Sequence, residues 1–161
     1  MNLKRITPFL WFNDNAEEAV NFYVSIFNNS KIGNISRQGK ASSEATKMAE
    51  GKIMVMGFEL DGQSFMALNG GPMFQFTHAI SFVVNCETQE EIDHYWNKLS
   101  EGGTIEQCGW LKDKFGLSWQ IVPTILGELM GKANPEKANK VMQVVMQCIK
   151  FNIEDLKKAA S

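Results

Sequence analysis

The chain has 161 residues, of which 44% are hydrophobic and 21% charged, and its formal net charge is −2. These values are ordinary for one globular domain with a core of its own. Acidic and basic residues are interspersed without a Lys/Arg cluster, which excludes nucleic acid as the expected partner. No apolar run approaches the ~20 residues that span a bilayer, so no membrane association is expected.

The three cysteines, Cys86, Cys108 and Cys148, form no Cys-x-x-Cys pair and favour a reducing compartment, so we predict a cytoplasmic protein.

The first half of the chain predicts one helix and four strands. In chain order these are a strand over residues 6–12, a helix over 16–27, a short strand over 31–37, and strands over 53–60 and 64–68. Asn13-Asp14-Asn15 supplies turn and capping chemistry before apolar residues at helical spacing. Asp61-Gly62 between the last two strands indicates a tight hairpin, because its turn requires positive φ.

The polar stretch from Gln38 to Gly51 is the longest irregular segment of the sequence. Its composition favours a solvated surface loop. The alternative is a lid over a ligand site, because long loops in compact domains often carry function.

The second half repeats this order. It predicts a strand over residues 78–84, a helix over 89–100 capped by Thr88 and stopped by Gly102-Gly103, and strands over 104–111 and 117–122. The repeat pairs Thr7 with His78, and the two hairpins align Gly62, Ser64 and Phe65 with Gly116, Ser118 and Trp119. We therefore predict two βαβββ modules.

We expect a single α+β domain over residues 1–161, with module one over about 1–72, module two over about 73–123 and a helical extension over about 124–161. Within the extension, apolar residues between Ile125 and Met130 predict a short helix. Pro135 predicts the first turn of a second helix, along which Val141 and Val144 lie.

Several ordered motifs accompany the paired modules. They are Asn13-Asp14-Asn15-Ala16-Glu17-Glu18-Ala19, Phe22-Tyr23, Asn69-Gly70-Gly71-Pro72, Ser81-Phe82-Val83-Val84, Gly109-Trp110, Asp113-Lys114-Phe115-Gly116-Leu117-Ser118-Trp119-Gln120 and Pro135-Glu136-Lys137-Ala138. With these motifs the chain resembles the glyoxalase/bleomycin-resistance (vicinal oxygen chelate) superfamily. It is most similar to the PhnB-like branch, often labelled the 3-demethylubiquinone-9 3-methyltransferase domain. The resemblance implies an eight-stranded mixed sheet curled around a cup, and a homodimer.

The resemblance also implies where a metal would bind. Superfamily enzymes hold a divalent ion through four side chains, commonly two histidines and two glutamates, and those positions correspond here to Thr7, Met66, His78 and Gln120. Only His78 is a good ligand for such an ion. We therefore predict no catalytic metal. We also predict no cofactor, because the Gly-x-Gly-x-x-Gly turn expected for S-adenosylmethionine is absent from the sequence.

Strand alternation predicts the lining of the cup. Residues of the same parity as the four metal positions include Phe9, Trp11, Ile80, Phe82, Ser64, Leu68, Ser118 and Val122. The predicted ligand-binding set is Thr7, Phe9, Trp11, Met66, His78, Phe82, Trp110 and Gln120. The alternative is that these aromatic side chains only fill a core.

His78 is the candidate catalytic residue, as a general acid or base, although no carboxylate is evidently placed to orient it. Three functions follow. The favoured one is metal-free binding of a small apolar or aromatic molecule. The first alternative is an enzyme with the activity of its relatives, either of glyoxalase or dioxygenase type or the methyltransferase of the family label. The second alternative is a metal-free enzyme that acts through His78 on a quinone-like or aromatic substrate.

Overall fold

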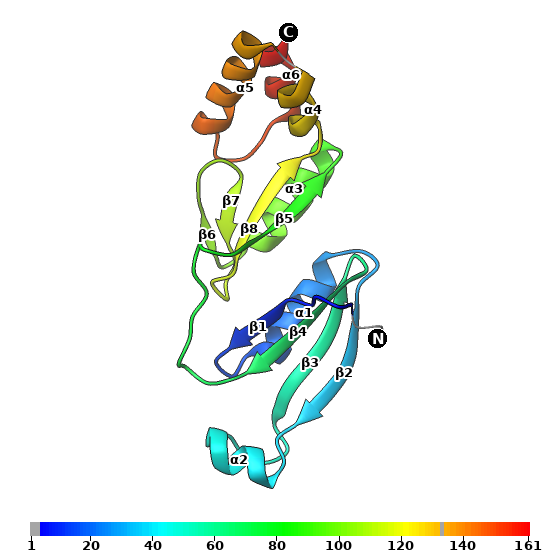
Figure 1. Cartoon of the computed structure of the whole chain (residues 1–161), viewed down its shortest axis with the longest axis vertical. Helices are drawn as coiled ribbons and strands as arrows, with labels where there is room; N and C mark the ends of the chain where they lie inside the picture. Colours follow the sequence, from blue (N-terminus) through cyan, green and yellow to red (C-terminus); the bar gives the residue numbers. More distant parts are fainter. Residues whose placement is uncertain (1–3, 133) are drawn as a thin grey trace. The chain divides into compact units, whose positions relative to one another are not determined.

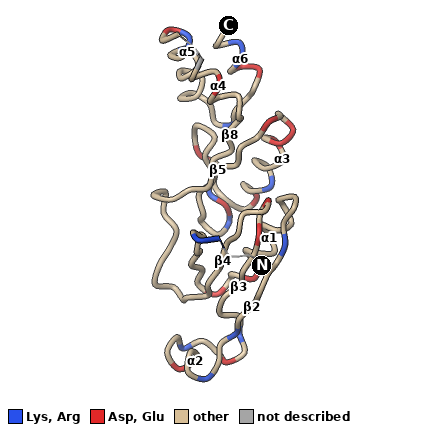
Figure 2. The backbone as a smooth tube through the Cα atoms, turned by 45° about the vertical axis from the view of Figure 1, so that its right-hand side comes forward, with Lys and Arg blue, Asp and Glu red and all other residues tan. Residues whose placement is uncertain are grey.

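The computed structural model describes residues 4–132 and 134–161, and the chain divides into two compact units, residues 1–75 and residues 76–161 (Figure 1). Each unit contains one four-stranded mixed sheet and a helix that packs against it, so the predicted α+β class is confirmed. Lys and Arg are interspersed with Asp and Glu along both units (Figure 2). Among the described residues, no helix has the length and apolarity needed to cross a membrane.

The first unit follows the predicted order with one added helix. Its elements are β1 (Phe9–Phe12), α1 (Ala16–Ile26), β2 (Lys31–Arg37), α2 (Lys40–Thr46), β3 (Ile53–Leu60) and β4 (Gln63–Asn69). The sheet order is β1-β4-β3-β2, with β1 parallel to β4 and the other pairs antiparallel. Alternate strand residues are buried on the side that α1 covers, and they include Leu10, Phe12, Met56, Phe58, Phe65 and Ala67.

Three local predictions for this unit have different outcomes. The Asp61-Gly62 hairpin is confirmed, with φ of 46° and 74° at its two residues. The prediction that residues 38–51 are irregular is wrong, because α2 lies inside that segment, beyond the ends of β2 and β3 (Figure 1). The first strand begins at Phe9 instead of Ile6, since only residues from Phe9 onward find partners in β4.

The second unit contains β5 (Ser81–Cys86), α3 (Gln89–Ser100), β6 (Thr104–Ile105), β7 (Trp110–Lys112), β8 (Ser118–Pro123), α4 (Ile125–Lys132), α5 (Pro135–Gln147) and α6 (Ile153–Ala160). Its sheet order is β5-β8-β7-β6, the same topology as in the first unit. The bounds of α3 and its Thr88 cap are confirmed: the Thr88 hydroxyl accepts a hydrogen bond from the Glu91 backbone, and the Glu91 side chain accepts one from the Thr88 backbone.

Two predicted strands of this unit are wrong in extent. The strand expected over residues 78–84 begins only at Ser81, because residues before it turn back on themselves, with the Ile80 backbone donating to Thr77. The strand expected over 104–111 is two short strands, β6 and β7. Positive φ angles at Cys108 (58°) and Gly109 (79°) interrupt it, and such angles are incompatible with an extended strand.

The sheet registers correct the alignment of the repeat. Phe9 lies beside Met66 in the first sheet, and Val83 lies beside Gln120 in the second. Because the two hairpins align Met66 with Gln120, Phe9 corresponds to Val83. The equivalent of Thr7 is therefore Ser81, and pairing Thr7 with His78 was wrong. Local sequence similarity could not reveal this offset, since only the ladder between strands sets register.

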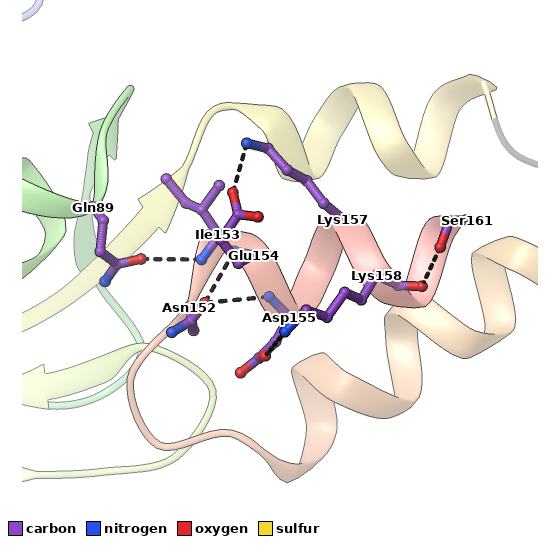
Figure 3. Close-up of polar contacts among 8 residues, drawn as sticks. All are labelled: Gln89, Asn152, Ile153, Glu154, Asp155, Lys157, Lys158 and Ser161. Atoms are coloured by element: carbon purple, nitrogen blue, oxygen red, sulfur yellow. Dashed lines mark hydrogen bonds and ion pairs between the residues drawn. The ribbon is translucent and has the colours of Figure 1, made fainter.

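The C-terminal helices are part of the second unit. Asn134 caps α5 and Pro135 occupies its first turn, as predicted, whereas α6 was not separately expected. Asn152 accepts hydrogen bonds from the first-turn backbone of α6, and Gln89 of α3 accepts one from Ile153 (Figure 3). The extension is thus fastened to α3 at the point where α6 begins.

Candidate functional site

Each sheet has one face away from its helix. Most side chains on that face are half-buried or exposed, whereas Ser64 and Ser118 are buried. We call the surface in the first unit (residues 1–75) the first open face and the surface in the second unit (residues 76–161) the second open face. Strand alternation selects which residues belong to each, because neighbours on paired strands point to the same side.

The first open face is apolar and aromatic. Phe9 and Met66 lie side by side on it, as do Trp11 and Leu68, and Phe9 is 53% exposed. The indole of Trp11 donates to the Gly71 carbonyl at 2.9 Å and meets the ring of Phe74 edge to face at 5.0 Å. A large aromatic side chain is therefore held in a fixed orientation at this surface.

Gly70 makes the position of Trp11 possible. A Cβ atom at residue 70 would lie 2.3 Å from the indole ring, so any other residue would displace it. The Asn69-Gly70-Gly71-Pro72 motif thus has a packing role beside the open face. Thr7 precedes β1, and its hydroxyl donates to the Lys4 carbonyl at 3.1 Å.

The segment predicted as a possible lid borders a cleft of this unit. The cleft measures about 320 Å³ and is lined by residues that follow β1 and β4 and by Thr46, Lys47, Met48, Ala49 and Lys52. The segment is closed at its base by backbone hydrogen bonds between Gln38 and both Gly51 and Lys52. Movement of the segment over a ligand stays a prediction.

The second open face is more polar. Ser81, Ser118 and Lys112 lie in one row across β5, β8 and β7, and Val83, Gln120 and Trp110 lie in the next. The amide of Gln120 donates to the Ser81 hydroxyl at 2.8 Å, while Val83 is 49% exposed. Trp110 and Gln120 are thus brought together on one surface.

Phe82 does not belong to this face, and its predicted position in the cup was wrong. In the parallel ladder it lies beside Trp119, a buried residue on the side that α3 covers, and the two rings are 5.6 Å apart. The error follows from the offset in the repeat, because a shift of three residues reverses the side on which a strand residue points. Ile80 lies in the turn before β5 and likewise is not a strand residue.

His78 has a carboxylate partner that the sequence did not reveal. Its Nε2 atom lies 2.7 Å from Oε1 of Glu106, which sits in the turn between β6 and β7. The ammonium group of Lys112 is 4.0 Å from the same oxygen. A carboxylate only accepts hydrogen bonds, so in the neutral imidazole Nε2 carries the proton and Nδ1 remains available to accept another. No local motif signals this pair, since it depends on how the β6–β7 hairpin turns.

The residues present do not fit the divalent metal of the superfamily's enzymes. Among the described residues, no three or more His, Cys, Asp or Glu side chains are grouped closely enough to hold a metal ion. At three of the four corresponding positions, the hydroxyl of Thr7 is bonded to a backbone carbonyl, the amide of Gln120 is bonded to Ser81, and Met66 offers only a thioether.

The thiols do not form a catalytic centre with these residues. Burial and then the nearby Glu91 carboxylate raise the pKa of Cys86 to about 12. Burial, and next the neighbouring Cys108, raise the pKa of Cys148. Both thiols are therefore held protonated near neutral pH.

Comparisons with known proteins agree with this architecture. The family model for 3-demethylubiquinone-9 3-methyltransferase matches residues 4–122. The PhnB protein from Bacillus cereus is 40% identical and covers 75% of this chain and 100% of its own, with a TM-score of 0.67. A protein from Pseudomonas aeruginosa is 20% identical over 75% of this chain and 98% of its own, with a TM-score of 0.60. The fosfomycin resistance protein FosX from Listeria monocytogenes is 17% identical over 82% of this chain and 99% of its own, with a TM-score of 0.55. The last two show the fold alone. No curated protein matches the sequence.

Proposed function

Because the chain belongs to the 3-demethylubiquinone-9 3-methyltransferase family, within the vicinal oxygen chelate superfamily, we propose that it binds a small apolar or aromatic molecule on the open faces of its sheets. The binding requires no catalytic metal. The observation that carries the proposal is the first open face, where Phe9, Trp11 and Met66 are left outside the helix-covered core. Apolar and aromatic surface with a few fixed polar groups is the usual composition of a small-molecule site.

The second open face supports the same function with different chemistry. Trp110 offers an indole beside the polar groups of Gln120 and Ser81. An aromatic ligand that stacks on an indole gains both buried apolar area and favourable ring geometry. The polar groups then select among ligands by their oxygen or nitrogen atoms.

A second candidate function is proton transfer on such a ligand. The observation that favours it is the 2.7 Å contact between His78 and Glu106, which leaves Nδ1 of the imidazole as a proton acceptor. His78→Ala separates the two functions. Turnover by the wild type that is lost in the variant at unchanged ligand affinity indicates proton transfer by His78. Ligand binding without turnover in either protein indicates a binding protein.

The binding proposal is tested by titrating the protein with naphthylmethanol and following nuclear magnetic resonance shifts. Phe9→Ser should raise Kd by about tenfold, because it removes roughly the contact energy of one aromatic side chain. Ile35→Ser is the matched control: Ile35 is 43% exposed on the same sheet but lies beside Met56, whose side chain points to the helix-covered side. The control should bind as the wild type does. Absence of binding to the wild-type protein, or an equal loss in both variants, would contradict the proposal.

A further inference from the structure

Ser118 carries a buried hydroxyl group for which the described part of the chain provides no hydrogen-bond partner. The residue is 0% exposed, and its Oγ atom bonds to no described residue. Buried polar groups are normally paired, and each exception needs a physical reason. An unpaired hydroxyl destabilises the ligand-free fold, so its presence points to a group that arrives from outside.

The sheet register aims this hydroxyl toward the second open face. Ser118 lies between Ser81 and Lys112, and the next residue, Trp119, is buried on the opposite, helix-covered side. Successive strand residues point to opposite faces, so the Ser118 side chain shares a side with Gln120. The group is therefore part of the same surface as Trp110.

The groups around Ser118 are hydrogen-bond donors. The Ser118 hydroxyl is free to donate, and the amide of Gln120 uses one of its two N–H groups on Ser81. Lys112 lies 4.0 Å from Glu106, whose nearer partner is His78 at 2.7 Å, so the ammonium group keeps capacity for another acceptor. Three donors on one surface, one of them cationic, match an acceptor with negative charge.

We propose that Ser118, Lys112 and Gln120 form a subsite for the carboxylate of an aromatic or apolar acid. The acid's ring lies against Trp110, which is in the adjacent row of the sheet beside Gln120. This inference rests on the proposed function and adds the class of ligand. In the bound state the Ser118 hydroxyl donates to the ligand, which explains why it is left unpaired in the free protein. The free protein is less stable as a result, and binding sites commonly lower stability in this way.

The experiment compares two ligands that differ only in the oxygen-bearing group, naphthoate and uncharged naphthylmethanol, and follows the binding of each through the indole signal of Trp110, which reports on the second open face. Wild-type protein should bind naphthoate more tightly. Ser118→Ala should raise Kd for naphthoate by about tenfold, as expected for one hydrogen bond to a charged group, and leave naphthylmethanol within about twofold. Lys112→Met should also weaken naphthoate selectively and abolish the salt dependence of its binding.

A second measurement needs no ligand. Removing an unsatisfied buried hydroxyl should stabilise the protein, so Ser118→Ala should raise Tm by about 2–4 °C. Ser64 is the matched control, because it occupies the equivalent position in the first unit, is 2% exposed, and does not share the unpaired buried hydroxyl found at Ser118. Ser64→Ala should lower Tm and leave naphthoate binding unchanged.

The outcomes separate this inference from the proposed function. If neither ligand binds the wild-type protein, the proposed function fails. If both bind but Ser118→Ala weakens them equally or not at all, or lowers Tm, the carboxylate subsite is wrong while apolar binding stands.

Discussion

Glu106 orients the imidazole of His78 from a hairpin turn 28 residues further along the chain. The sequence identified His78 as the candidate acid or base, because histidine is the usual residue for proton transfer near neutral pH. It could not identify Glu106, because the turn between β6 and β7 depends on positive φ at Cys108 and Gly109. At the residue scale, this pair therefore joins one predicted and one unpredicted side chain.

We expect Glu106→Gln to change the tautomer of His78. In the wild type the acceptor-only carboxylate holds the proton on Nε2, whereas an amide can donate or accept, so the variant should populate both neutral tautomers. Nitrogen-15 chemical shifts of the ring, recorded at about pH 8.5 where imidazole is neutral, report the tautomer directly. Glu101→Gln, at the exposed end of α3, is the control and should leave the ring signals unchanged. A mixture of tautomers already present in the wild type would contradict this role of Glu106.

At the scale of elements, the two repeat-related helices begin by different means. Helix α3 is capped by its own Thr88, which the sequence predicted. Helix α1 is not capped by the Asn15 side chain. Its first backbone N–H, at Ala16, donates instead to the Asn69 side chain at the end of β4, and the Asn69 amide donates to the Ile53 carbonyl. One buried asparagine thus joins a helix and two strands.

We expect Asn69→Ala to lower the free energy of unfolding by about 2–4 kcal/mol, because it leaves a buried donor and a buried acceptor unpaired. Asn15→Ala should cost less than about 0.5 kcal/mol, since the Asn15 side chain makes no capping bond. Urea unfolding of both variants measures the difference. Equal losses in the two variants would show that the contacts of Asn69 do not determine the start of α1.

The elements that the sequence predicted well are those decided by neighbouring residues. Apolar spacing and a capping box define α3 over its full length, and Asp61-Gly62 defines the first hairpin. The start of β5 and the division of the expected strand over 104–111 were not predictable, because partner strands and backbone turns outside the pattern set them.

At the scale of the whole molecule, the C-terminal helices are integrated into the second unit. The Lys150 ammonium group binds the Asp93 carboxylate of α3 at 2.6 Å, and the Gly109 backbone donates to Ile149. A Cβ atom at Gly109 would lie 2.4 Å from the ring of Phe151, which is buried against it. The extension thus closes one end of the sheet that carries the second open face.

The ion pair between Asp93 and Lys150 predicts a pH dependence of stability. Hydrogen bonds from Lys150 and then Gln89 lower the pKa of Asp93. A lowered carboxyl pKa stabilises the fold above the ordinary Asp value of about 3.9, and this contribution is lost as the pH falls through the lower folded-state pKa. Asp93→Asn should therefore lower the urea midpoint at neutral pH, and the difference from wild type should shrink in acid.

Glu50→Gln controls for the loss of one negative charge, because Glu50 is exposed in the first unit. It should leave the midpoint unchanged at both pH values. A deficit of Asp93→Asn that persists undiminished in strong acid would show that packing, and not the charge, is responsible.

The sequence by itself determined the two βαβββ modules, their family, the bounds of α3, those of α1 to within one residue, and the aromatic residues of the first open face. These features follow from patterns between near neighbours: alternation, helical spacing, caps and turn dihedrals. The continuous cup, the homodimer and the cytoplasmic location stay predictions. Only the tertiary structure decided which residues share a face, that Thr7 corresponds to Ser81, that Glu106 meets His78 and that Ser118 is left unpaired. Strand register and contacts between distant residues set these features, and a change of register by an odd number of residues reverses every side chain on a strand.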